Sequence, residues 1–114
     1  MLTNTTPVLP VTDAKEAIAF YRDRLGFQVA FEAGPDYCGV VRDAALVHLD
    51  AVVNGGAGAV TCRIDTDAVD DLYAELEPQG VVDPDEPIRD TPFGTRQFSV
   101  IDCCGNRITF VRAS

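Results

Sequence analysis

The order of helix and strand patterns repeats once along these 114 residues, and this repeat limits the fold more than any other feature. Asp13 precedes an amphipathic segment that ends at Gly26, and Asp67 precedes a second one that ends at Gly80. An aspartate before a helix and a glycine after it are typical helix boundaries. The two aspartates lie 54 residues apart, as do the two glycines. A constant spacing of this kind predicts two copies of one structural unit.

Each copy is expected to contain one strand, one helix and three further strands, in that order. In the first half, alternating apolar residues and turn residues predict strands at 6–11, 27–33, 37–41 and 45–50, with a helix at 13–26. In the second half they predict strands at 58–64, 86–90, 96–101 and 107–112, with a helix at 67–80. The glycine-rich stretch 53–58 is the expected joint. The chain is thus predicted to be one α+β domain, residues 1–114, with βαβββ modules at about 5–52 and 57–113.

Both helices should bury one face. Apolar residues recur three and four positions apart, which predicts one buried stripe on each helix. The stripes are Ala14, Ala17, Ile18, Tyr21 and Leu25 in the first helix, and Val69, Leu72, Tyr73 and Leu76 in the second. The first strand should lie at an edge of its sheet, because Pro7 and Pro10 cannot donate backbone hydrogen bonds.

The composition indicates a folded domain and argues against two classes of partner. Hydrophobic residues make up 46% of the chain, yet no apolar run reaches the roughly 20 residues of a membrane span. No basic segment precedes a hydrophobic one at the amino terminus, so we expect no membrane partner and a cytoplasmic location. The net charge of −9 repels phosphate backbones, which argues against a nucleic-acid partner.

The negative charge is concentrated in one stretch. From Asp65 to Asp90 there are ten acidic residues and one base, Arg89. Such a stretch is either a solvated surface that aids solubility or a field that attracts a cationic ligand. Both interpretations stay open from the sequence.

The four cysteines do not form a metal-binding pattern. Cys38, Cys62 and the adjacent pair Cys103 and Cys104 include no C-x-x-C spacing, and the chain has one histidine, His48. In a cytoplasmic chain these residues are expected to be free thiols. The adjacent pair could alternatively form a strained disulfide.

Several segments together resemble the vicinal oxygen chelate superfamily. A proline-containing first strand, the helix "DAKEAIAFYRDRLGF" and the closing hairpin "DCCGNRITFV" carry the resemblance over nearly the whole chain. This superfamily includes glyoxalase I, extradiol dioxygenases, fosfomycin-resistance enzymes and bleomycin-resistance proteins. The resemblance implies paired βαβββ modules whose curled sheets enclose a cup. One departure is that Cys103 replaces the proline of the usual D-P-x-G-N turn, while Gly105 and Asn106 are kept.

Within the superfamily the chain is most similar to the bleomycin-binding resistance proteins. The segments "YRDRLGF", "YCGVVRD", "DDLYAEL" and "PFGTRQF" all look like parts of that family. The resemblance implies a homodimer that sequesters a cationic drug in crevices between its subunits, without chemistry. It also implies that a flat ring of the ligand lies between two aromatic side chains, which correspond here to Tyr37 and Phe93. Alternatively, Phe93 anchors its loop on its own subunit or contacts the second subunit.

The resemblance also locates the metal ligands of the superfamily's enzymes. They correspond to Thr6, His48, Ala59 and Thr109. Alanine cannot bind a metal, and threonine hydroxyls are poor ligands for Zn²⁺, Fe²⁺ or Mn²⁺. We therefore expect no metal, no cofactor and no catalytic residue. Asp50 could supply a second ligand beside His48, so a divergent metal-dependent lyase or dioxygenase remains the alternative.

His48 lies in the alternating segment "ALVHLD", which should send His48 and Asp50 to one face of a strand. We expect this mixed face to line the cup together with Arg63 and Thr109 from neighbouring strands. The predicted ligand-binding residues are Tyr37, His48, Asp50, Arg63, Phe93 and Thr109. The alternative is that Asp50 pairs with Arg63 or Arg107 and side chains fill the cup. The sequence thus predicts a metal-free protein that binds a small, cationic molecule.

Overall fold

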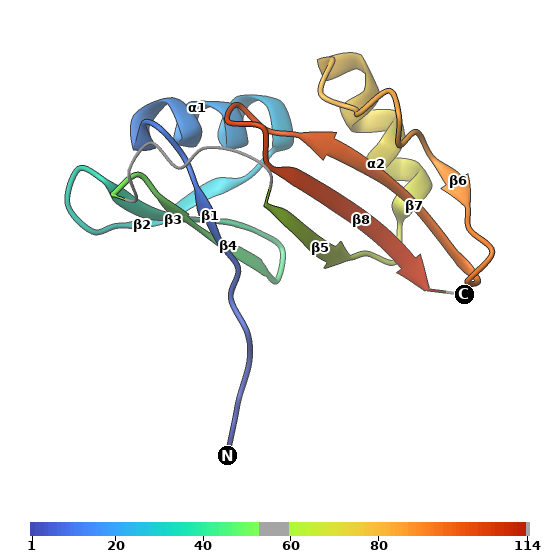
Figure 1. The fold of residues 1–114 in the computed structure, drawn as a ribbon, viewed down its shortest axis with the longest axis horizontal. Coiled ribbons are helices and arrows are strands. Elements are labelled where there is room, and N and C mark those ends of the chain that lie inside the picture. Colours follow the sequence, from blue (N-terminus) through green and yellow to red (C-terminus); the bar gives the residue numbers. More distant parts are fainter. Residues whose placement is uncertain (53–59, 114) are drawn as a thin grey trace.

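The computed structural model describes residues 1–52 and 60–113, which form two modules with the same order of elements (Figure 1). The first module contains β1 (Val8–Pro10), α1 (Ala14–Leu25), β2 (Gln28–Glu32), β3 (Tyr37–Arg42) and β4 (Ala45–Asp50). The second contains β5 (Thr61–Asp65), α2 (Val69–Leu76), a 3₁₀ turn η1 (Glu77–Gln79), β6 (Arg89–Asp90), β7 (Thr95–Ile101) and β8 (Arg107–Ala113). The predicted joint at 53–58 lies outside the described residues.

Each module builds one mixed four-stranded sheet, and the two sheets have equivalent topology. Sheet A has the order β1-β4-β3-β2 and sheet B the order β5-β8-β7-β6. In both, the strand before the helix runs parallel to the last strand of the module, and the other pairs are antiparallel. The first strand lies at a sheet edge, as its prolines predicted. The predicted α+β fold of two βαβββ modules is confirmed.

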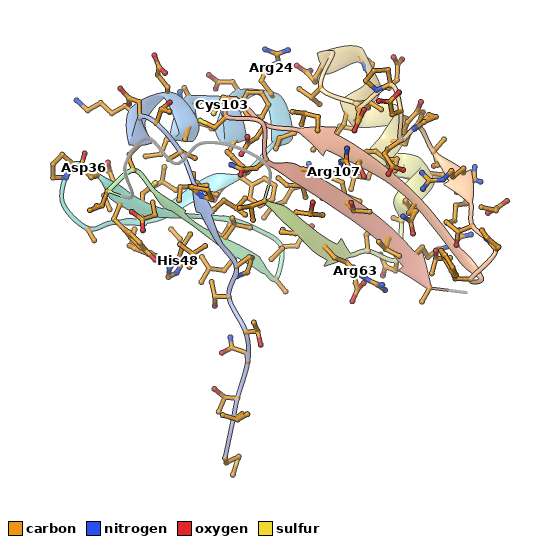
Figure 2. All side chains as sticks on the ribbon, viewed as in Figure 1. Arg24, Asp36, His48, Arg63, Cys103 and Arg107 are labelled. Atoms are coloured by element: carbon orange, nitrogen blue, oxygen red, sulfur yellow. The ribbon has the colours of Figure 1, made fainter. Side chains whose placement is uncertain are left out.

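One helix covers one face of each sheet. Helix α1 packs on β2, β3 and β4, and α2 packs on β7 and β8. The opposite faces, which we call the open faces, carry no helix from residues 1–52 or 60–113. Figure 2 shows His48 and Arg63 on this open side, one on each sheet. The open faces therefore hold the side chains that are available to a ligand.

Helix α1 has the boundaries that the sequence predicts. The Asp13 carboxylate accepts hydrogen bonds from the backbone N–H groups of Lys15 (2.8 Å) and Glu16 (3.1 Å). Gly26 ends the helix in the left-handed conformation, with φ of 76°. All five residues of the predicted stripe are buried.

Helix α2 begins differently, and the prediction of Asp67 as its N-cap is wrong. The N-cap is Ala68, which has no side-chain capping bond, and Thr66 Oγ1 instead accepts from the Ala68 N–H (3.1 Å). Gly80 does end the following 3₁₀ turn, with φ of 71°. The equal spacing of the two aspartates therefore has no structural meaning, whereas the two glycines are equivalent.

Strand β6 is shorter than the predicted strand 86–90. The segment before it instead runs beside β7, where the Asp83 N–H donates to the Ser99 carbonyl (2.9 Å) and the Ser99 N–H to the Glu86 carbonyl (3.0 Å). Pro84 and Pro87 interrupt this segment and cannot donate. Regular pairing with β7 is therefore restricted to Arg89 and Asp90.

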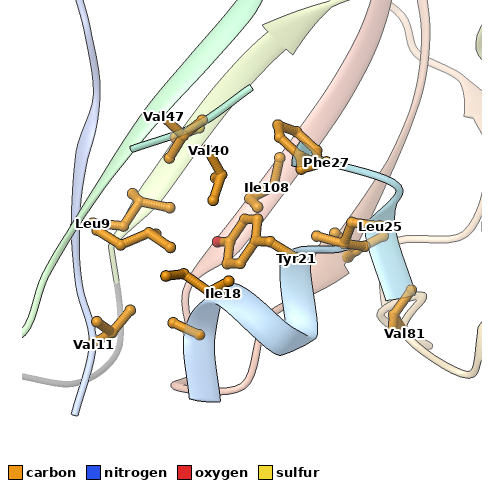
Figure 3. Packing of buried hydrophobic residues seen from close by; sticks show 14 of the residues in the cluster. Leu9, Val11, Ile18, Tyr21, Leu25, Phe27, Val40, Val47, Val81 and Ile108 are labelled. Atoms are coloured by element: carbon orange, nitrogen blue, oxygen red, sulfur yellow. The ribbon is translucent and has the colours of Figure 1, made fainter. Parts of the chain in front are cut away.

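The buried side chains of both modules belong to one cluster. Figure 3 shows Tyr21 of α1 beside Ile108 of β8, and Leu25 near Val81. The Tyr21 hydroxyl also donates a buried hydrogen bond to Asp102 Oδ2 (2.7 Å). Burial, and next the Asp102 charge, raise the pKa of Tyr21 far above its usual value, so the hydroxyl keeps its proton as the donor. The core thus joins α1 to the β7–β8 hairpin.

Candidate functional site

Strand alternation places His48 on the open face of sheet A, as predicted. Val47 and Leu49 are buried under α1, while His48 is only partly buried. In the sheet register Tyr37 lies opposite Asp50, and Gly39 lies opposite His48. Directly opposite residues point to the same side of a sheet. Tyr37, His48 and Asp50 therefore share one face.

Three rings on this face form what we call the aromatic group: Phe31, Tyr37 and His48. Tyr37 Oη and His48 Nδ1 are 2.8 Å apart, which is a hydrogen-bond distance. The Phe31 ring meets the His48 ring edge-to-face at 4.9 Å between centroids and lies roughly parallel to the Tyr37 ring at 6.4 Å. With Nδ1 engaged by Tyr37, Nε2 is the remaining polar atom of the imidazole.

Gly39 makes room for this arrangement. A Cβ atom at Gly39 would lie 2.2 Å from Phe31 Cε1, so the Phe31 ring rests directly on the glycine backbone. A register shift between Val29 and Phe31 turns the Phe31 side chain to the open face. Sequence reasoning missed Phe31, because simple alternation does not reveal a bulge. The only available indication was an aromatic residue in a strand that precedes a glycine-containing strand.

The open face of sheet B has a different chemistry. Arg63, Thr109 and Ser99 are aligned across β5, β8 and β7, and the Ser99 and Thr109 hydroxyls are 2.8 Å apart. Arg63 pairs with Asp65 at 3.0 Å, and Arg107 pairs with Asp83 at 3.2 Å. Because Ser99 is buried, this face offers the partly buried Thr109 hydroxyl and charged groups in place of rings.

Asp50 does not pair with an arginine. Its Oδ1 accepts a hydrogen bond from the Val52 N–H (2.8 Å), while Arg63 and Arg107 have the carboxylate partners described above. The alternative in which Asp50 pairs with one of these two arginines is therefore wrong. Asp50 serves the backbone at the end of β4.

Phe93 lies apart from both open faces, in the turn between β6 and β7. Its side chain is 86% exposed. The turn is held by Thr91, whose N–H donates to the Thr95 carbonyl (2.8 Å) and whose Oγ1 accepts from the Phe93 N–H (3.3 Å). The interpretation that Phe93 anchors its loop on its own subunit is wrong. A ligand or a second subunit remains as the surface that could cover it.

The six predicted site residues thus fall into three places within one chain. Sheet A carries Tyr37, His48 and Asp50, sheet B carries Arg63 and Thr109, and the β6–β7 turn carries Phe93. A cavity of about 1250 Å³ separates the modules, and Arg63 is the one predicted site residue among those described that line it.

The wall of this cavity is rich in carboxylates. Arg42 makes a two-pronged ion pair with Glu75 across it, with both nitrogen–oxygen distances at 2.7 Å. Three further carboxylates on the wall, Asp43, Asp67 and Asp71, make no ion pair with any described residue. The cavity therefore has a surplus of negative charge.

The positions that correspond to metal ligands do not come together in the described chain. His48 is on sheet A, while Thr109 is on sheet B and is engaged with Ser99. Ala59 lies outside the described residues. Within residues 1–52 and 60–113, no three His, Cys, Asp or Glu side chains are grouped so that they could hold a metal ion. A metal-free site remains a prediction.

The buried thiols do not suit nucleophilic chemistry. Burial, followed by the charge of Glu32, raises the pKa of the Cys38 thiol, and burial followed by the charge of Asp102 raises that of Cys62. A raised pKa keeps a cysteine in its unreactive protonated form at neutral pH.

Comparison with known proteins agrees with this architecture. Residues 1–114 match the family model described as glyoxalase superfamily protein. The chain belongs to the glyoxalase superfamily. The bleomycin resistance protein of Geobacillus stearothermophilus is 33% identical over an alignment of 123 positions. The alignment covers 91% of this chain and 92% of that protein.

Two solved structures share the fold of this glyoxalase superfamily member. The bleomycin resistance determinant encoded on transposon Tn5 matches with a TM-score of 0.83 at 18% identity, over 99% of both chains. The bleomycin-binding protein of Streptomyces verticillus, in complex with copper(II)-bleomycin, matches with a TM-score of 0.78 at 25% identity, over 100% of this chain and 98% of that one. In the described part of the protein, no helix is both long and apolar enough to span a bilayer.

Proposed function

We propose that this protein binds and sequesters a cationic, flat-ringed compound of the bleomycin type, without catalysis. The observation that carries the proposal is the aromatic group on the open face of sheet A, where Phe31, Tyr37 and His48 are held together by ring contacts and one hydrogen bond. No helix in the described part of the chain covers the group. The relatives that are bleomycin resistance or bleomycin-binding proteins support the ligand class.

The aromatic group suits a flat and positively charged ligand. A ring stacked on an aromatic side chain gains about 0.5–1.5 kcal/mol beyond the burial of its area. A cation over a ring gains roughly 0.5–1 kcal/mol at an exposed site. Because the fixed rings lose little freedom on binding, the site is preorganised for such a guest. The net charge of −9 attracts cations over a longer range.

We further propose that two copies of the chain form the complete site. In one chain the aromatic group and the polar face belong to different sheets, and Phe93 is exposed on a third surface. A second copy could place its polar face, with Arg63 and Thr109, opposite the aromatic group of the first. The ligand would then lie in a crevice between subunits, and Phe93 would be covered there.

Titration calorimetry with metal-free bleomycin tests the ligand assignment. Tyr37→Ala, Phe31→Ala and Phe93→Ala should each weaken binding by about tenfold, which corresponds to about 1.4 kcal/mol. Val29→Ala is the matched control, because Val29 is on the same strand as Phe31 but pairs with Val40, which faces α1. Wild-type protein that gives neither heat nor a shift in melting temperature would remove bleomycin as the ligand.

Sedimentation equilibrium tests the dimer separately. We expect twice the mass of the chain at micromolar concentration, and a stable monomer would contradict a site shared between subunits.

We also propose that the protein is cytoplasmic, because all four of its cysteines are free thiols and free thiols persist in a reducing compartment. Cell fractionation checks this location.

A further inference from the structure

The turn between β7 and β8 carries two adjacent thiols that the proposed function does not use. Cys103 Sγ and Cys104 Sγ are 3.7 Å apart and are not bonded to each other as a disulfide. In Figure 2 Cys103 lies near α1, on the side of the molecule opposite to His48 and Arg63. The pair is therefore separate from the candidate ligand site.

The backbone of this turn is held firmly by Asp102. Its Oδ1 accepts from the N–H groups of Cys104 (2.8 Å) and Asn106 (2.9 Å). Its Oδ2 accepts from the Tyr21 hydroxyl (2.7 Å) and from Asn106 Nδ2 (2.9 Å). Because a buried carboxylate with four donors fixes both ends of the turn, the two cysteines between them are kept close.

The two thiols can also be reached from solvent, unlike the other cysteines. Cys103 is exposed and Cys104 is partly exposed, whereas Cys38 and Cys62 are buried. Cys104 Sγ contacts the Thr12 N–H at 3.4 Å and Thr12 Oγ1 at 3.6 Å, at the junction of β1 and α1. A ligand on this pair would replace the two weak contacts of Cys104 Sγ with Thr12.

We propose that Cys103 and Cys104 form a chelating site for a trivalent arsenical that carries one organic group. Such an arsenic atom has two valences left after its bond to carbon, and two thiols satisfy both of them. Trivalent arsenic is pyramidal because it keeps a lone pair, so its two sulfurs lie somewhat closer than the roughly 3.8 Å of a tetrahedral centre with bonds of about 2.3 Å. The sulfurs of this turn are 3.7 Å apart, so a small rotation of the two side chains brings them to the required distance.

The binding step balances without an oxidant or a reductant. An organic arsenic(III) oxide loses its arsenic–oxygen bonds and gains two arsenic–sulfur bonds. The two thiol protons leave with that oxygen as one molecule of water. Arsenic stays trivalent and both sulfurs keep their oxidation state.

The protonation state of Cys103 limits thiolate reactions at this turn and sets the proton balance of the proposed step. Desolvation, followed by the hydrogen bond to Cys104, raises the pKa of Cys103 to about 12. Cys103 is therefore protonated at neutral pH and is a poor nucleophile for thiol–disulfide exchange. As a thiol, it carries the proton that the departing oxygen requires.

Phenylarsine oxide added to the reduced, full-length protein tests the proposal by intact-mass spectrometry. We expect one phenylarsenic group per chain, retained in excess monothiol and removed by a dithiol. Cys103→Ser and Cys104→Ser should each weaken binding about 100-fold or more, because a single sulfur loses the advantage of two linked attachments. Cys38→Ala is the control and should bind as wild type.

A second measurement uses only the wild-type protein and therefore does not depend on whether the variants fold. In the wild-type protein, the backbone N–H resonance of Thr12 should shift when the arsenical binds, because Cys104 Sγ leaves it. Equal affinity of wild type and both serine variants would overturn the proposal, as would an adduct on Cys38 or Cys62. So would an adduct that excess monothiol removes.

Discussion

The two sheets are alike on the faces that pack and unlike on the faces that are open. Under α1, sheet A buries Val40, Val47 and Leu49, and sheet B likewise buries apolar residues such as Phe98 and Phe110 toward α2. On the open side, sheet A presents an aromatic group, while sheet B presents hydroxyls and paired charges.

This difference separates the requirements of folding from those of binding. A helix must cover an apolar surface in both modules, so that face keeps its character wherever the unit is repeated. The exposed positions of the open faces contribute little to packing and can differ without loss of the fold. Their contrast, rather than their shared topology, therefore supports the proposal that a ligand is recognised there.

The prediction with the largest expected effect concerns whether the stability of the fold comes from the packed faces. Phe98 is fully buried and its ring contacts Tyr73 and Phe110 at centroid distances of 5.0 and 5.3 Å. Phe98→Ala should lower the free energy of unfolding by about 3–5 kcal/mol, measured by urea denaturation. Phe31→Ala on the open face should cost much less. Equal losses would mean that the open face of sheet A belongs to the core, and the comparison would fail.

The sequence predicts the packed faces well, because their periodicity is repeated over many residues. All five stripe residues of α1 are buried, and Val47 and Leu49 alternate with His48 as expected. The errors fall where one local contact decides the outcome. Asp67 has the right residue type for an N-cap, but Thr66 bonds to the N–H of Ala68 instead.

The candidate site is less predictable, because it depends on register and on which surfaces meet. Tyr37 and His48 were predicted separately, and their hydrogen bond follows from pairing that the sequence does not state. Phe31 joins them only through a register shift, and Gly39 matters only because that ring lies on it. Phe93 is exposed, so no contact within the described chain fixes its role.

The second prediction tests whether the aromatic group is built on Gly39. In Gly39→Ala the new methyl group would overlap the Phe31 ring, which must then leave its contact with His48. We expect a loss of about 1–3 kcal/mol in unfolding free energy and weaker binding of bleomycin. The double variant Gly39→Ala, Phe31→Ala should lose less than the sum of the two single changes. Additive losses would show that the overlap is not the cause.

The third prediction separates the hydroxyl of Tyr37 from its ring. Tyr37→Phe removes the hydrogen bond to His48 Nδ1 and should cost about 0.5–1.5 kcal/mol of unfolding free energy. Because the ring remains, binding should weaken less than in Tyr37→Ala. Tyr73→Phe is the control, since the Tyr73 hydroxyl has no hydrogen bond to the described residues, and it should stay close to wild type. If Tyr37→Phe binds bleomycin as weakly as Tyr37→Ala does, then Tyr37 acts through its hydrogen bond rather than through stacking of its ring.

The smallest expected effect concerns the contact between the modules. The hydrogen bond from Arg42 lowers the pKa of Glu75, so the folded state holds this carboxylate ionised more strongly than the unfolded state does. The resulting stability is present above the unfolded pKa of about 4.3 and is lost as the pH falls through the lower, folded value. Since the Glu75 side chain is 49% exposed, we expect only about 0.2–1 kcal/mol.

Urea denaturation of Glu75→Gln between pH 7 and pH 3 measures this contribution. The variant should be less stable than wild type at neutral pH, and the two should converge in acid, where wild-type Glu75 is also neutral. Glu77→Gln, in the adjacent turn, is the control, because Glu77 makes no ion pair with the described residues. If the difference in unfolding free energy between wild type and Glu75→Gln persists below the pKa of Glu75 in the folded state, the Arg42–Glu75 contact acts through its shape rather than its charge. The modules would then be joined by packing and by hydrogen bonds such as those of Tyr21 with Asp102 and of Asn106 with Pro10, with no electrostatic contribution from the Arg42–Glu75 pair.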